Sequence, residues 1–161
     1  MIQPGTMTLT LQGDREILVT RQFDAPRNLV YDAFTKPELL KRWFTGPPGW
    51  TLAVCEPGKK VGDAYRYVWK SPDGMEMGMG GVVTELKPPE RMSATEKFDQ
   101  SWYPGSATST IVLTEENGKT LLTQTIVYDS NEARDIVLKS PMEQGMAMGY
   151  NSLEAMLATL V

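Results

Sequence analysis

The sequence predicts a single α+β domain in which an antiparallel sheet is followed by a long C-terminal helix. Residues 50–128 contain one strand-like run after another, separated by turn signals, and residues 140–161 carry an apolar stripe at helical spacing. A length of 161 residues suits one domain with a sizeable core. We therefore expect one domain over residues 1–161, with disorder within residues 1–6.

The first 50 residues predict a strand followed by two short helices. Residues 16–23 are rich in β-branched and aromatic side chains, and residues 7–11 alternate in a way that allows them to pair with this strand. Pro26 suits the first position of a helix, and apolar residues follow it at helical spacing. A second short helix is expected from Pro37 until the run Gly46-Pro47-Pro48-Gly49 ends it.

Turn signals divide residues 50–128 into the strands of an antiparallel meander. In strand 63–70 every second side chain is aromatic, so three rings share one face of the sheet. Gly78, Gly80 and Gly81 interrupt the next strand and predict a bulge or bend there. The alternation assigns to the apolar face Tyr65, Tyr67, Trp69, Met75, Met77, Met79, Met92, Ala94, Phe98, Leu122, Gln124, Ile126 and Tyr128.

The C-terminal segment is predicted to be helical from Ser130 onward, with one or two turns up to Leu138. Ser140 is then expected to cap a longer helix, with Pro141 in its first turn and Glu143 as the capping-box partner. This helix would run for roughly 20 residues, or about 30 Å, to the end of the chain. Its apolar stripe contains Met142, Met146, Leu153, Met156, Leu157 and Leu160.

Two glycines four residues apart, Gly145 and Gly149, interrupt the first half of this helix. Each costs a helix about 1 kcal/mol relative to alanine, so their presence needs a reason. Either they let the helix pack closely on the sheet, or the missing side chains leave space beneath it. The residues alone leave both alternatives open.

The composition excludes several kinds of chemistry. The chain lacks histidine and has one cysteine, which excludes Ser-His-Asp triads, His-ligated metals, disulfides within the chain and multi-cysteine zinc sites. A net charge of −4 argues against nucleic-acid binding, and no apolar run approaches the roughly 20 residues of a membrane span. Since residues 1–5 also lack signal-peptide features, we expect a cytoplasmic protein with no metal and no organic cofactor.

The chain contains, in order, the matching runs 21–27, 31–43, 62–67, 72–74, 81–85, 88–91 and 142–146. Their order and spacing resemble the bacterial branch of the activator of heat-shock protein 90 ATPase-like family, within the START-like (SRPBCC) superfamily. The resemblance covers the chain from about residue 9 onward. It implies a helix-grip fold: a curved antiparallel sheet wrapped around a long C-terminal helix, with two short helices after the first strand. It also implies a cavity between sheet and helix, which accepts a hydrophobic ligand in many relatives.

The apolar side chains expected between sheet and helix form the candidate ligand site, because aromatic rings and methionines adapt to flat or irregular apolar molecules. A completely filled core is the alternative. Gln124 lies on the apolar face and would either anchor a ligand or hydrogen-bond to the backbone. The predicted lining consists of Trp43, Phe44, Tyr65, Tyr67, Trp69, Met77, Met79, Met92, Phe98, Gln124, Met142, Gly145, Met146 and Gly149.

Candidate catalytic groups are few. Without histidine, an acid or base would have to be a carboxylate, tyrosine or lysine with a shifted pKa, and Glu96 is the best candidate because it shares the inward alternation of its strand. Glu76 and Glu85 are weaker, since the glycines make their direction uncertain. Cys55 has no evident base nearby and is predicted to be an inert thiol.

The sequence therefore predicts binding of a small hydrophobic molecule, a lipid or an aromatic compound, in the cavity. A module that binds a chaperone or another protein is the first alternative, with the loop 102–105 as a partner surface, a lid over the cavity or a simply packed loop. A cyclase- or hydrolase-like enzyme that uses the Glu96 carboxylate is the second.

Overall fold

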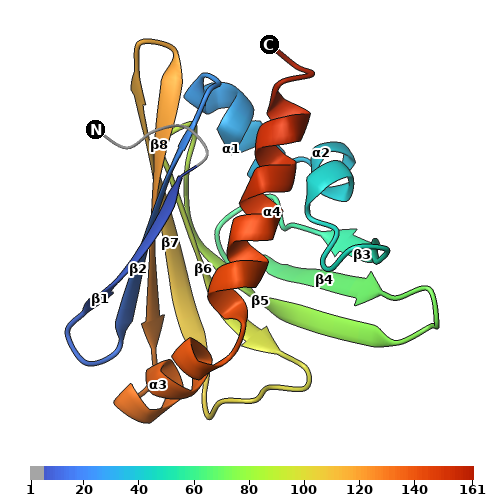
Figure 1. The fold of residues 1–161 in the computed structure, drawn as a ribbon, viewed down its shortest axis with the longest axis vertical. Helices are drawn as coiled ribbons and strands as arrows, with labels where there is room; N and C mark the ends of the chain where they lie inside the picture. The colour runs from blue at the N-terminus through green and yellow to red at the C-terminus, as the bar shows by residue number, and fades with distance from the viewer. Residues whose placement is uncertain (1–5) are drawn as a thin grey trace.

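The computed structural model describes residues 6–161, which form an eight-stranded antiparallel sheet and four helices (Figure 1). Of the segment expected to be disordered, residues 1–5 lie outside the described residues, and Thr6 is exposed. The strands are β1 (Met7–Gln12), β2 (Glu16–Phe23), β3 (Thr51–Glu56), β4 (Ala64–Lys70), β5 (Glu76–Lys87), β6 (Arg91–Phe98), β7 (Ala107–Glu116) and β8 (Lys119–Tyr128). The helices are α1 (Arg27–Thr35), α2 (Pro37–Trp43), α3 (Asn131–Lys139) and α4 (Met142–Leu157).

The sheet has the strand order β1-β2-β8-β7-β6-β5-β4-β3 and curves around α4 (Figure 1). Helices α1 and α2 flank the C-terminal half of α4, and α3 lies beside its start. This arrangement confirms the α+β helix-grip fold. Residues 7–11 do pair with the following strand, as part of β1, so the two short helices come after the second strand.

Alternation of side chains builds the core between sheet and helices. Every second residue is buried along β2 and along β8, and the two strands pair directly. The buried residues of these strands include Ile17, Val19 and Leu122, all fully covered. The period of two therefore assigns the inner face correctly in this half of the sheet.

The three glycines of β5 have a different role from the predicted one. The strand is continuous from Glu76 to Lys87, and its register shift lies between Val83 and Glu85, so a bulge at the glycines is wrong, while the alternative of a bend stays a prediction. A Cβ at Gly81 would overlap the carbonyl oxygen of Thr95, and one at Gly78 would overlap the carboxylate of Asp99. The glycines are required by close approach of neighbouring groups.

Met75 does not belong to the apolar face. It precedes β5, is 63% exposed, and its amide donates to the Ser71 side chain in the turn that leads into the strand. The prediction that Met75 lines the inner face is therefore wrong, because the turn extends one residue further than expected.

The start of α4 also differs from its prediction. Ser140 ends α3 rather than capping α4, because its hydroxyl donates to the Val137 carbonyl oxygen. Pro141 takes the N-cap position of α4, and no side chain caps that end. The predicted capping box with Glu143 is therefore wrong. At the other end the helix stops at Leu157, so Leu160 lies beyond the stripe and is 36% exposed.

We predict that Gly81→Ala lowers the free energy of unfolding by about 2 kcal/mol or more, because the added methyl group forces β5 and β6 apart. Urea unfolding followed by circular dichroism measures the change. Met75→Ala, at an exposed position, is the control and should change stability by less than about 0.5 kcal/mol. Equal stability of the two variants would show that the strands tolerate the methyl group.

Candidate functional site

Helix α4 is anchored by its C-terminal half. Its buried side chains, Tyr150, Leu153, Met156 and Leu157, all belong to that half. The N-terminal half has no fully buried side chain, and Met142 and Met146 are half-buried. The helix therefore grips the core with one half and extends the other half over the sheet.

The two glycines of α4 face open space. A Cβ built at Gly145 or Gly149 has no neighbouring atom within 4 Å. At about 100° per residue, both glycines lie on the flank of the helix that also carries Met156, away from Ala147. Close packing of the helix on the sheet is therefore wrong as the explanation of these glycines, and the structure supports the alternative of space beside the helix.

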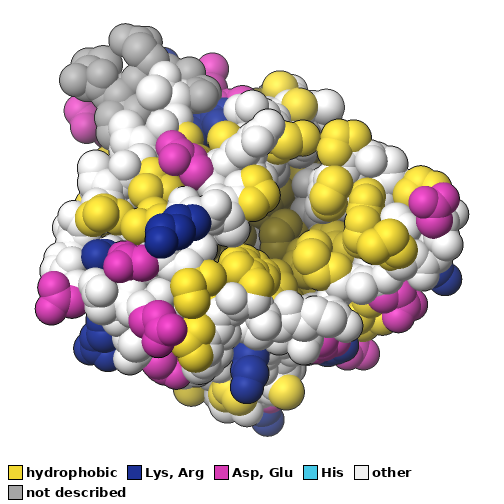
Figure 2. All heavy atoms as spheres, turned by 60° about the horizontal axis from the view of Figure 1, so that its bottom comes forward, with side chains coloured by type: hydrophobic (Ala, Val, Ile, Leu, Met, Phe, Trp, Pro, Cys, Tyr) yellow, Lys and Arg dark blue, Asp and Glu magenta, His cyan; other side chains and the backbone are white. Residues whose placement is uncertain are grey.

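The inner face of the sheet remains partly accessible under this part of the helix. Side chains of β5, β6 and β7 that point inward, Met77, Met92, Phe98 and Ser109 among them, are only half-buried. Inward side chains near the centre of a sheet stay accessible only where nothing fills the space above them. Figure 2 shows a hollow with a hydrophobic floor on the end of the molecule that lies at the bottom of Figure 1.

The predicted lining residues fall into two groups. Trp43 lies in the packed core, with its ring 5.1 Å from that of Phe34 and 6.4 Å from that of Tyr150, and Trp69 is covered by Phe44. Trp43, Tyr65, Tyr67, Trp69, Met79 and Gln124 are buried and form the packed wall. Phe44, Met77, Met92, Phe98, Met142, Met146 and Gly149 are half-buried, and Gly145 is exposed.

Gln124 links the sheet to the helix. The Tyr150 hydroxyl donates to its Oε1, and its Nε2 donates to the Ser109 hydroxyl at 2.9 Å. Both ends of the amide are thus occupied by side chains, and its predicted bond to the backbone is absent from the described residues. Gln124 supports the wall rather than offering a free group to a ligand.

Glu96 is a half-buried carboxylate on the inner face of β6. The register places it opposite Ala107, which in turn pairs with Tyr128. Burial raises the pKa of its carboxyl from 4.5 to about 7, with no hydrogen bond or ion pair from residues 6–161 to lower it. Its charge also helps to raise the pKa of four tyrosine hydroxyls from different elements: Tyr65, Tyr103, Tyr128 and Tyr150.

The other two carboxylates considered from the sequence face elsewhere. Glu85 binds Arg91 and lies 3.4 Å from the Lys87 ammonium group, and these cations lower its pKa. Glu76 is exposed and pairs with Lys70 across the strands. Both are surface groups, so Glu96 is the one carboxylate of the three that faces the space between sheet and helix.

The loop 102–105 folds back over the inner face. Tyr103 is buried with its ring 5.4 Å from that of Tyr128, and the Trp102 ring lies 4.9 Å from that of Phe98. Within residues 6–161 the buried Tyr103 hydroxyl has no hydrogen-bond partner. These contacts favour the lid among the three interpretations of this loop, although Trp102 itself is 42% exposed.

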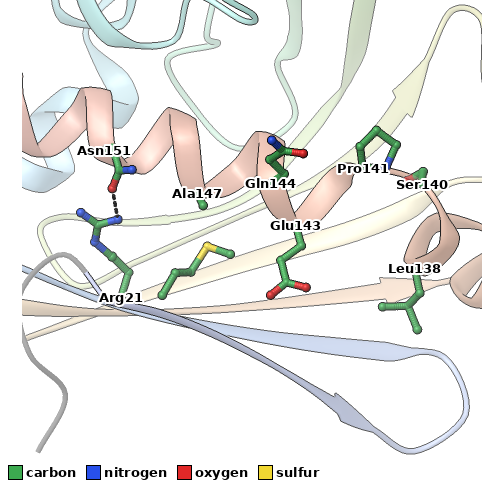
Figure 3. A pocket seen from close by; sticks show the side chains of 9 residues that line it. Arg21, Leu138, Ser140, Pro141, Glu143, Gln144, Ala147 and Asn151 are labelled. Carbon is green, nitrogen blue, oxygen red and sulfur yellow. Dashed lines mark hydrogen bonds between the residues drawn. The ribbon is translucent and has the colours of Figure 1, made fainter.

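A second pocket lies on the opposite flank of α4 and contains no predicted site residue (Figure 3). The Arg21 side chain is 1% exposed and donates from Nη1 to the Asn151 Oδ1 at 2.8 Å, and its Nη2 lies 3.7 Å from Glu154. A charged residue between buried neighbours of β2 was the sequence signal that could have revealed this pocket. Its volume is about 520 Å³, and it is lined by Met7, Arg21, Leu138, Ser140, Pro141, Glu143, Gln144, Ala147 and Asn151.

The thiol of Cys55 has no partner suited to catalysis. It is half-buried, its nearest hydrogen-bond partner is the Pro37 carbonyl oxygen at 4.0 Å, and burial raises its pKa. Over residues 6–161 there is no group of three or more Cys, Asp or Glu side chains placed to hold a metal ion. None of the helices in this part of the chain is long and apolar enough to cross a membrane.

A sheet that grips a C-terminal helix above an apolar hollow defines the helix-grip class of proteins. Within that class the chain belongs to the family described as Activator of Hsp90 ATPase homolog 1-like protein, whose family model matches residues 24–158. No curated protein matches the chain.

Solved structures of bacterial proteins share this fold. A protein from Rhodobacter sphaeroides is 30% identical, with a TM-score of 0.89 over 95% of this chain and 98% of the other. A protein from Chromobacterium violaceum is 28% identical, with a TM-score of 0.71 over 92% and 98%. The AHSA1 protein from Silicibacter pomeroyi, at 18% identity, has a TM-score of 0.73 over 91% and 99%.

We predict that Glu96→Gln stabilises the protein at alkaline pH. In the wild type the folded state binds more protons than the unfolded state between pH 4.5 and about 7, so stability falls as the pH rises through this window. The amide does not titrate, and the variant should gain up to about 3 kcal/mol above the window, at about 1.4 kcal/mol per pKa unit. Urea unfolding from acid to alkaline pH measures the gain, and a pH-independent difference would contradict the placement of Glu96.

We predict that Gly149→Ala raises the free energy of unfolding by about 1 kcal/mol, since alanine favours the helix and the methyl group meets open space. Thermal unfolding measures the effect. Gly80→Ala is the matched control: the same substitution should not stabilise the protein there, because the Cβ would lie 2.9 Å from the Tyr65 carbonyl oxygen. A loss of stability in Gly149→Ala would mean that this flank of α4 is closely packed.

Proposed function

We propose that the protein binds a small hydrophobic molecule in the hollow between the sheet and the N-terminal half of α4. The observation that carries this proposal is the combination of half-buried inward side chains with glycines that face open space. Family membership supports it, because a helix-grip fold provides a cavity of this kind, while the residues that line the hollow provide the specificity.

The lining suits an apolar molecule of irregular shape. Met77, Met92 and Met146 are half-buried, so their flexible thioethers can adjust to a ligand. Removal of apolar surface from water contributes about 25 cal/mol per Å², which makes burial the main source of affinity. Behind these methionines lies the packed wall, in which the rings of Tyr65, Tyr67 and Trp69 contact one another. These contacts hold the rings in place, so that they do not move into the hollow.

The lid formed by residues 102–105 supports sequestration from water. Because the Trp102 ring contacts Phe98, whose side chain faces inward, movement of this loop would change access to the floor of the hollow. Binding and release therefore need only a local change in a loop, and the sheet and α4 can remain as they are.

We predict that Met146→Trp weakens uptake of the neutral fluorophore N-phenyl-1-naphthylamine by about tenfold or more, because the larger ring occupies the hollow. The increase in fluorescence on titration with the probe measures binding. Met148→Trp is the matched control: the same change two residues further along α4, at a side chain that is 42% exposed. The control should bind as the wild type does.

Circular dichroism and thermal unfolding establish that both tryptophan variants are folded. A folded Met146→Trp variant with unchanged uptake would show that the probe does not occupy the space beside Met146. Absence of probe binding to the wild type would overturn the proposed function itself.

A further inference from the structure

A site for purely apolar molecules would not need an ionisable group such as the Glu96 carboxylate. It is half-buried on the inner face of β6 and receives no hydrogen bond or ion pair from any described residue. An ionised carboxylate held in an apolar space without a partner is costly for the folded state. Such a group is retained most readily where a ligand supplies the missing partner.

The residues beside this carboxylate in the sheet have small side chains, and tyrosines follow them. On one side Glu96 pairs with Ala107 of β7, and on the other the register of β5 and β6 brings Gly81 opposite it. The next inward residues across the sheet are tyrosines on both sides: Tyr65 pairs with Gly81, and Tyr128 pairs with Ala107. In this row of five strands the carboxylate therefore lies at the centre, with a tyrosine two strands away on either side, and the Tyr65 hydroxyl reaches back across β5 to donate to the Thr95 carbonyl oxygen at 2.6 Å.

Further aromatic rings lie on the same side of the sheet as the carboxylate, and that of Tyr103 is near enough for the Glu96 charge to help raise the pKa of its hydroxyl. The Tyr103 ring, from the loop, contacts the Tyr128 ring. Phe98 lies two residues after Glu96 on the same face of β6, and its ring contacts that of Trp102. Aromatic faces are negative at their centres and attract cations. The surroundings of Glu96 thus combine one carboxylate with several rings of the kind that bind an ammonium group.

Among residues 6–161, no cation pairs with this carboxylate. The titratable groups that face Glu96 are the hydroxyls of Tyr65 on β4, Tyr103 in the loop, Tyr128 on β8 and Tyr150 on α4, and all stay neutral because their pKa values are raised. Arg21 is engaged with Asn151 and Glu154 on the other flank of α4. A counterion for the ionised form of Glu96 must therefore come from outside residues 6–161.

We propose that the hollow selects amphiphilic cations, in which an ammonium group is attached to an apolar body. This inference rests on the proposed function and names the class of its ligand. The ammonium group lies against the Glu96 carboxylate and the surrounding tyrosine rings, and the apolar body lies along the methionines of the sheet and of α4. A cation–carboxylate contact away from bulk water is stronger than the same contact at the surface.

The test compares ligands that share a decyl chain and differ in the head group. Decyltrimethylammonium, decanol and decyl sulfate, each below its micelle concentration, displace bound N-phenyl-1-naphthylamine from the wild type, from Glu96→Gln and from Glu76→Gln. Glu76 is exposed on the neighbouring strand, so its amide variant removes the same charge from the outer surface. We expect the cation to bind the wild type about tenfold or more tightly than decanol, and this preference to persist in Glu76→Gln.

In Glu96→Gln the cation should bind no better than decanol, while the affinity for decanol stays the same or rises. Because decyltrimethylammonium keeps its charge at every pH, its affinity for the wild type should increase as the pH rises through about 7, where Glu96 ionises. Equal affinities of the wild type for the cation and decanol would overturn the inference but leave the proposed function standing. If none of the three decyl ligands and not even the fluorophore bound to the wild type, both this inference and the proposed function would be overturned.

Discussion

The position of Tyr150 is the constraint on which the rest of the structure depends. Its ring makes edge contacts with Phe23 of β2 and Phe34 of α1 and stacks on Trp43 of α2, and its hydroxyl donates to Gln124 of β8. Four elements from distant parts of the chain thus meet one side chain of α4. Because each aromatic contact is directional, together they fix both the height of the helix above the sheet and its rotation.

Anchoring at one end explains why the other end can stand away from the sheet. Beyond Tyr150 toward its start, α4 presents glycines on one flank and half-buried methionines below, so no large side chain fills the space over β5 and β6. The sheet curves around α4 (Figure 1), and the molecule has a hollow with a hydrophobic floor (Figure 2). Glu96 lies on the inner face of β6 as a group that is costly to bury in its ionised form, and this cost is the basis of the proposed recognition of a cationic ligand.

Local patterns predicted most of the elements and much of the site. The alternation in β4 and β8 assigned their inner faces, and the turn signals separated the strands. The same alternation identified Glu96 as facing inward. Predictions based on a single residue's local role were less successful. Ser140 ends α3 instead of capping α4. The glycines of β5 lie where neighbouring groups come too close for a side chain, and not at a bulge. In each case a neighbour distant in the sequence, or a competing carbonyl oxygen, determined the outcome.

The sequence by itself determined most of the side chains that face the space between sheet and helix, with Met75 as an exception, because inward direction follows from periods of two and 3.6 that are local properties of the backbone. It also determined that no histidine takes part in the chemistry. Only the tertiary structure decided that Trp43 is buried in the core while Met146 stays half-buried, and that Glu96 receives no hydrogen bond or ion pair from residues 6–161. These outcomes depend on how far α4 stands from the sheet, a distance set by contacts among Phe23, Phe34, Trp43 and Tyr150 that no local pattern contains.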